Sequence, residues 1–247
     1  MRLLRVALPI FAVVTVAAAQ SPDPPLADTR LTVHTLVRED LFAGFLENDM
    51  TRFERGERSI DALFESRPGD RANLLAWKGS ANLYRAVRAH EAGNAAEFTR
   101  YFQQVRDNFA EATKLQGPTD GVPAIIGGSI SVFGDRLPPE VRAAAWSQAF
   151  DAYSLLWKFQ GPAVDKLPVH FRGELLAGLA QSAQRTGRTQ ETAEYLDRLI
   201  TSLAGTPYEA EAKRWKADPA AAANSKITCK NCHNPGRLSA TLRTLGQ

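Results

Sequence analysis

Apolar residues recur every three or four positions from about Leu31 to Trp215, and this spacing constrains the fold more than any other feature of the chain. It places the apolar side chains on one face of an α-helix. Gly, Pro, Asn or Asp interrupts the pattern at intervals of helical length, and no segment shows the sustained alternation that is typical of a strand. The sequence therefore predicts an all-α protein.

Most of the expected helices form consecutive pairs. One hairpin cannot bury its apolar face alone, so the pairs are expected to stack and share a core. Trp77 and Tyr84 lie at helical spacing, and we expect them to pack in this core and not to form a ligand surface. The expected helices are 34–47, 51–66, 71–92, 95–115, 123–133, 138–159, 171–186, 189–203 and 208–215.

This pattern resembles the tetratricopeptide repeat, a helical hairpin of about 34 residues. Trp77 and Tyr84 have the spacing of the large aromatic residues on the first helix of that repeat, and Ala112 followed by Pro118 is similar to the close of its second helix. The large and small residues around the repeat's turn are matched by Leu176, Leu179, Ala180, Ala183, Gly187, Leu196 and Leu199. The resemblance implies an α-solenoid of antiparallel hairpins over residues 31–216, whose surface binds a protein partner.

Residues 1–19 have the features of a secretory signal peptide. Arg2 and Arg5 form a positive start, and an apolar stretch too short to span a bilayer comfortably follows at 8–18. Small residues at 17–19 predict cleavage near Ala19, and a retained anchor is the alternative. We expect a periplasmic or secreted protein that is not an integral membrane protein, because no later stretch is long and apolar enough to span a bilayer.

Two segments outside the repeats have a different composition. Residues 20–30 are rich in proline and are expected to form an exposed arm, because the run 21–25 cannot be helical. Residues 217–226 are rich in alanine and predict a linker that stays loose or adds one helical turn after Pro219. The linker leads to a tail at 227–247.

The tail contains the motif that indicates a chemical function for the protein. Residues 229–233 read Cys-Lys-Asn-Cys-His, and Cys229 and Cys232 are the only cysteines of the chain. C-x-x-C-H resembles the haem-attachment motif of c-type cytochromes. The resemblance implies that Cys229 and Cys232 form thioethers with the two vinyl groups of haem c and that His233 binds its iron. An exported location agrees with this expectation.

Two other chemistries fit the same residues. Cys229 and Cys232 can form a disulfide or a reversible dithiol, although no βαβ pattern surrounds them as in thioredoxin. Together with His233 they also supply three of the four ligands of a zinc site.

The second axial ligand of a haem at this motif stays open. No histidine or methionine follows His233, so the candidates are Met50, His34, His90 and His170, or no protein ligand at all. For each of them an ordinary structural role is the alternative. Lys226 and Lys230 are weaker candidates, because a protonated amine does not bind iron.

The charge balance excludes an electrostatic nucleic-acid binder. The formal net charge is +3, and Arg2 and Arg5 of the leader account for two of these charges. Arg52, Arg55 and Arg58 alternate with acidic residues and predict a solvated, salt-bridged helix face.

These observations favour an exported repeat scaffold with one covalently bound haem c, which exchanges electrons with a docked protein partner and is not itself an enzyme. The first alternative is a protein-interaction module without haem, in which the cysteines form a disulfide or a metal clip. The second is a haem enzyme or gas sensor with an open axial position. The oligomeric state and the partner are not indicated by the sequence.

Overall fold

The computed structural model describes residues 23–228 and 236–246. Within these two ranges it contains eleven α-helices, three short 3₁₀ helices and no strand, which confirms the all-α prediction. The leader at 1–19 lies outside the described residues, as do Cys229, Cys232 and His233. No helix in the described ranges combines the length and the apolar character that crossing a membrane requires.

The nine helices expected from the periodicity are present, and their ends agree with the prediction to within two residues. The helices are α1 (Val33–Glu47), α2 (Met50–Ser66), α3 (Arg71–Glu91), α4 (Ala95–Leu115), α5 (Val122–Phe133), α6 (Pro139–Gln160), α7 (Val169–Arg185), α8 (Thr189–Ser202), α9 (Pro207–Ala217), α10 (Pro219–Ala222) and α11 (Arg237–Thr244). The single turn α10 follows Pro219, and α11 is a helix of the tail that the sequence did not predict.

Short polar turns reverse the chain between paired helices. Asn48 ends α1 in the left-handed region with φ of 57°, and Asp49 then accepts a hydrogen bond from the amide of Arg52 to begin α2. The turn between α7 and α8 uses Gly187, whose φ of 72° is strained for any residue with a Cβ atom. Such turns bring each helix back along the one before it.

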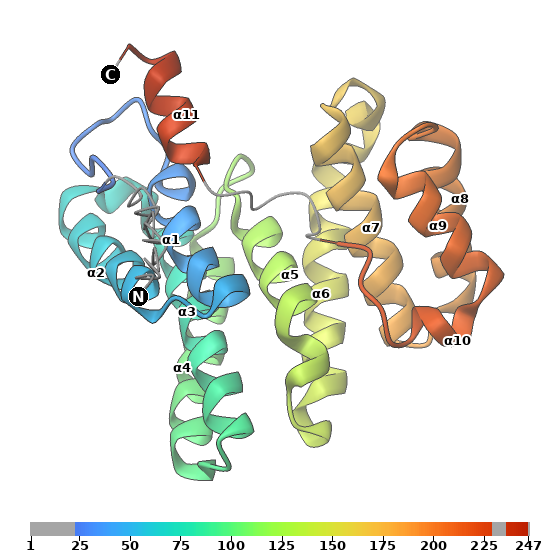
Figure 1. Ribbon diagram of the computed structural model, residues 1–247, viewed down its shortest axis with the longest axis horizontal. Helices are drawn as coiled ribbons and strands as arrows, with labels where there is room; N and C mark the ends of the chain where they lie inside the picture. Colours follow the sequence, from blue (N-terminus) through green and yellow to red (C-terminus); the bar gives the residue numbers. More distant parts are fainter. Residues whose placement is uncertain (1–22, 229–235, 247) are drawn as a thin grey trace, which may run out of the picture.

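The helices pack as consecutive pairs: α1 with α2, α3 with α4, α5 with α6, and α7 with α8. The first helices of the pairs also contact one another in sequence, α1 with α3, α3 with α5 and α5 with α7 (Figure 1). This places α1, α3, α5 and α7 next to one another along the stack. The tetratricopeptide arrangement of the pairs remains a prediction.

Large aromatic side chains fill the space between the pairs. Trp77 and Tyr84 are only 3% and 2% exposed, which confirms that they are core residues. Where two helices approach closely, a glycine faces an aromatic ring. A Cβ atom added to Gly178 of α7 would lie 2.2 Å from the Tyr153 ring of α6, so this contact requires glycine.

The proline-rich arm is held against the body, at least from residue 23 onward. The Arg67 guanidinium at the end of α2 donates hydrogen bonds to the carbonyl oxygens of Leu26 (2.9 Å), Asp28 (2.7 Å) and Leu31 (2.6 Å). Leu26 is partly buried and packs against the core. The described part of the arm is therefore docked at these residues, although Asp23, Ala27, Thr29 and Arg30 are exposed as the sequence predicted.

We predict that Gly178→Ala lowers the free energy of unfolding by about 1–3 kcal/mol, because the added methyl group overlaps the Tyr153 ring. Gly128→Ala in α5 is the matched control, since nothing lies within 4 Å of the added Cβ atom. This control should raise the free energy of unfolding by about 0.5–1 kcal/mol, because alanine favours a helix more than glycine does. Urea denaturation of both variants measures the difference, and equal effects would contradict the close approach of α6 and α7.

Candidate functional site

The candidate site is the segment that contains Cys229, Cys232 and His233, which lies outside the described residues. The described chain nevertheless shows where this segment begins and ends. It begins after Thr228, which lies against α7, and it ends before Gly236, which lies against α1 (Figure 1). The site is therefore built from these two anchors and the side chains around them.

The first anchor is the side chain of Gln181 on α7. Its amide oxygen accepts hydrogen bonds from the backbone N–H of Ile227 (3.0 Å) and Thr228 (3.4 Å) and from the Thr228 hydroxyl (3.2 Å). Its amide nitrogen donates to the carbonyl oxygen of Ser131 on α5 at 3.4 Å. Gln181 is fully buried, so these bonds form where water does not compete and fix the chain at Thr228.

The linker before this anchor is also fixed. Arg185 of α7 donates hydrogen bonds to the carbonyl oxygens of Ala222 (3.0 Å) and Ser225 (2.8 Å). The same guanidinium forms two 3.0 Å contacts with the Asp135 carboxylate. The Lys226 ammonium contacts the carbonyl oxygen of Val132 on α5. Residues 222–226 thus follow α5 and α7 closely and do not form the loose linker that was one of the two expectations.

The second anchor is the carboxylate of Glu39 on α1. It accepts hydrogen bonds from the backbone N–H of Gly236 (3.1 Å) and Leu238 (2.8 Å), at the beginning of α11. The first N–H groups of a helix lack partners within that helix, and a negative charge there is favourable. Leu238 is 4% exposed and joins the core, and Leu242 packs against the same core, so α11 is held by polar and by apolar contacts.

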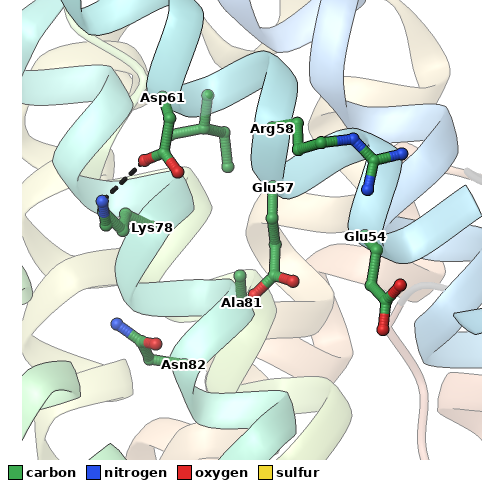
Figure 2. Close-up of a pocket in the computed structure, with 8 residues that line it drawn as sticks. Glu54, Glu57, Arg58, Asp61, Lys78, Ala81 and Asn82 are labelled. Carbon is green, nitrogen blue, oxygen red and sulfur yellow. Dashed lines mark hydrogen bonds and ion pairs between the residues drawn. The ribbon is translucent and has the colours of Figure 1, made fainter.

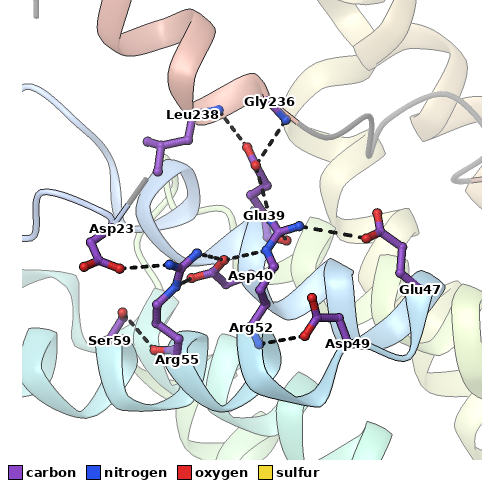
Figure 3. Close-up of polar contacts among 10 residues, drawn as sticks. All are labelled: Asp23, Glu39, Asp40, Glu47, Asp49, Arg52, Arg55, Ser59, Gly236 and Leu238. Carbon is purple, nitrogen blue, oxygen red and sulfur yellow. Dashed lines mark hydrogen bonds and ion pairs between the residues drawn. The ribbon is translucent and has the colours of Figure 1, made fainter. Parts of the chain in front are cut away.

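Arg52 and Arg55 of α2 support this anchor (Figure 3). Arg52 contacts Glu39 and Asp40 at 3.2 Å each, and Arg55 makes two 2.6 Å contacts with Asp40. Asp40 is only 4% exposed and is therefore a buried charge that needs both partners. The prediction of a solvated face is wrong for these two arginines, which pair with α1 and not with acidic residues of their own helix. Arg58 is exposed as expected.

Polar and aromatic side chains share one face of α1 near the second anchor. His34, Arg38 and Phe42 follow one another at a spacing of four residues, and Arg38 contacts the Nε2 atom of His34 at 3.2 Å. The rings of His34 and Phe42 lie 5.2 Å and 6.3 Å from the ring of Trp77 on α3. The buried Nε1 atom of Trp77 has no hydrogen-bond partner in the described structure, which is an unusual state for a buried donor.

A second histidine lies at the beginning of α7. A ring nitrogen of His170 lies 3.3 Å from the hydroxyl of Tyr208, and this hydroxyl donates to Glu174 at 2.7 Å. Burial lowers the pKa of His170, and the charges of Arg237 and Arg38 lower it further, against the opposing effect of Glu174.

The charges of Arg38 and Arg237 also lower the pKa of His34. Protein around His34 lowers its pKa from 6.5 to about 3, and Arg38 and Arg237 add to this effect, although part of the residue is open to solvent. Arg38 and Arg237 therefore lower the pKa of both His34 and His170. At neutral pH the His34 imidazole is neutral and keeps a lone pair that could bind a metal.

The other two candidate ligands lie elsewhere. His90 follows Trp77 by thirteen residues on α3, or about 20 Å along the helix, and packs 5.8 Å from the Phe98 ring on α4. Met50 begins α2, beyond the opposite end of α1 from His34, and packs against the core. His90 and Met50 are thus separated along the helices from His34.

Two surface hollows lie outside this region. One of about 320 Å³ lies between α2 and α3, and its acidic lining is largely paired, with Asp61 bound to Lys78 at 2.7 Å (Figure 2). The other, of about 450 Å³, includes Tyr84, Arg88 and the ion pair between Glu91 and Arg136. Sequence reasoning indicated neither hollow.

The sequence analysis also missed the anchoring residues. Glu39, Gln181 and Arg185 carry no motif. Only Gln181 could have been suspected from the sequence, because it is a polar residue within the apolar run of α7. The described residues contain no group of three or more His, Cys, Asp or Glu side chains that could hold a metal ion. No protein family, curated protein or solved structure matches the chain.

We predict that Glu39→Ala loosens α11, because the first N–H groups of that helix lose their acceptor. Removing such a cap costs about 0.5–2 kcal/mol, so amide hydrogen exchange in residues 238–244 should become several-fold faster. Glu47→Ala is the matched control, since Glu47 also lies on α1 and approaches Arg52, at 3.9 Å, but is 47% exposed. Equal exchange in both variants would show that Glu39 does not hold α11.

Proposed function

We propose that this protein is an exported electron carrier with one haem c, bound by thioethers to Cys229 and Cys232 and through iron to His233. The observation that carries the proposal is the anchoring of a C-x-x-C-H segment at both of its ends. Gln181 holds the chain before the motif and Glu39 holds it after the motif. A covalent cofactor between these anchors would be held against the helical body.

The side chains around the anchors suit a haem. Its porphyrin is apolar and its two propionates are negative, and the described surroundings offer both kinds of partner. Phe42 is an aromatic residue of α1 one turn from Arg38, and Arg38 and Arg237 supply positive charge. When bound, haem c would supply one-electron transfer.

The protein's own residues would position and shield the cofactor. Gln181 and Glu39 fix the two ends of the seven-residue interval 229–235, so the attached group would have a limited range of positions. The buried side chains of Phe42 and Trp77 would exclude water from one side. A lower local polarity and an imidazole ligand both influence the reduction potential of the iron.

The helical body would act as a tetratricopeptide-like scaffold for a protein partner. The consecutive helix pairs support this interpretation. Val169 and Phe171 at the beginning of α7 are 47% and 61% exposed and flank His170. A redox partner that contacted this apolar rim would approach the haem region through a small interface, as weak electron-transfer complexes do.

The intact mass of the exported protein tests this proposal. We predict that protein made with its own leader, in bacteria that mature cytochromes c, carries the added mass of one haem that denaturation does not release. Cys229→Ser and Cys232→Ser should each lose a thioether, because each removes one sulfur. Asn231→Ala is the control, since it changes the motif without removing a thiol or the imidazole.

Each alternative function predicts a different intact mass of the purified protein. A colourless protein that has lost two hydrogens would indicate a disulfide, and zinc released on denaturation would indicate a metal clip. Either result would overturn the haem proposal and leave a helical interaction module.

A further inference from the structure

We propose that the hollow between α2 and α3 binds an extended, uncharged peptide segment of a partner protein, and that the carboxamide of Asn82 pairs with a peptide group of that segment. The hollow has a volume of about 320 Å³, and its lining residues belong to these two helices. That volume lies within the range of known ligand sites. The hollow shares no residue with the motif or with its two anchors, so it would bind the segment whether or not the protein carries a haem.

Asn82 on α3 is a buried polar residue that forms no hydrogen bond in the described structure. It is 8% exposed, and its carboxamide faces the hollow beside Lys78 and Ala81 (Figure 2). Within 23–228 and 236–246, every other buried Asp, Asn, Gln, Ser or Thr side chain forms at least one hydrogen bond. These residues are Asp40, Ser59, Ser80, Ser129, Ser131, Gln181, Ser182 and Thr228. A buried carboxamide with nothing to bind is therefore the exception in this fold.

Asn73, earlier on the same helix, shows the contrast. Its carboxamide donates a hydrogen bond to Asp120 at 3.1 Å and accepts one from the N–H of Gly121 at 3.0 Å. Both functions of Asn73 thus hold the chain just before α5. Asn82 has the same two functions, an acceptor oxygen and an NH₂ donor, and both are available to a ligand.

The charged side chains next to Asn82 are already engaged with one another. Asp61 binds Lys78 at 2.7 Å, and Glu57 binds the Nε atom of Arg85 at 2.7 Å. Lys78 precedes Asn82 by about one helical turn, and Arg85 follows it by nearly one turn. These two pairs join α2 to α3 on both sides of Asn82 and leave the position between them without a partner.

The charges around the hollow balance, so an uncharged ligand fits best. The carboxylates of Glu57 and Asp61 are neutralised in the two ion pairs, and Glu54 and Arg58 add one charge of each sign. Glu54 and Arg58 are exposed on α2 and have no hydrogen bond or ion pair in the described part of the chain. A net charge on the ligand would have no opposite charge in excess to meet it.

The lining has the donors and acceptors that a peptide main chain needs. An extended chain presents a row of N–H and carbonyl groups. The Glu54 carboxylate accepts N–H groups, the Arg58 guanidinium donates to carbonyl oxygens, and Asn82 does both. Because Glu54 and Arg58 are exposed, the ligand would lie at the protein surface, where a segment of a larger protein can reach it.

NMR spectroscopy of the purified protein tests this inference with a tetraalanine peptide that is acetylated at one end and amidated at the other. We expect the peptide to shift the side-chain NH₂ signal of Asn82 and the backbone signals of Glu57 and Asp61 in a saturable way. The same peptide methylated at every main-chain nitrogen is the matched ligand control. It should bind more weakly, because it has no main-chain N–H group to donate.

Two asparagine variants form a crossed control. Asn82→Ala should weaken binding of the peptide by about tenfold, the effect of losing two neutral hydrogen bonds. It should leave the urea midpoint unchanged, because Asn82 holds no other group of the described structure. Asn73→Ala should lower the urea midpoint and leave binding unchanged, since its hydrogen bonds lie outside the hollow. A purely structural role of Asn82 would instead lower the midpoint of both variants and leave binding unchanged in both.

Each other outcome has a definite meaning. The inference is overturned by the absence of saturable shifts, by equal binding of the two peptides, or by equal binding to wild-type protein and Asn82→Ala. Tighter binding of a blocked tetralysine or tetraglutamate peptide would overturn the assignment of an uncharged segment. Saturable binding by protein that carries no covalent haem would support this inference although the proposed function had failed.

Discussion

The carboxylate of Glu39 links the two ends of the described chain. It binds the backbone at the beginning of α11 and the guanidinium of Arg52, and Arg52 also pairs with the buried Asp40. A buried charge is tolerated only with partners, so α1 and α2 must pack in the register that presents these arginines to Asp40. The same register points Glu39 at the tail. The first helical hairpin and the last helix of the protein thus depend on one polar network.

Gln181 anchors the chain before the motif, as Glu39 anchors it after the motif. Because it is fully buried, its amide must be satisfied by protein groups, and it binds the chain at residues 227 and 228. The interval 229–235 therefore joins α7 to α1. In a single small domain a haem needs several helices to enclose it. Here the helical stack would provide that enclosure, and the short tail would need only to supply the thiols and the imidazole.

The periodicity of the sequence was sufficient to predict the helices because each of them buries an apolar face. The short α5 was also predicted, over 123–133, and it buries most of its residues. The tail helix α11 was missed because it has eight residues and depends on Glu39 and on the pocket for Leu238 for its stability. Arg52 and Arg55 were interpreted wrongly for a related reason. Their neighbours in sequence are acidic, but their partner in space, Asp40, is on another helix.

By itself the sequence determined the helical class, the ends of the helices and the presence of a C-x-x-C-H motif, because these follow from local spacing and from residue chemistry. It left four equivalent candidates for a second ligand, since a histidine or methionine has no local signal for the group that it faces. Only the tertiary structure separated them. It packed His34 against Trp77, His170 against Tyr208 and His90 against Phe98, and it placed Met50 against the core. Which side chains meet across α1, α7 and α11 depends on how the helices stack, and that is decided by contacts between residues far apart in the chain.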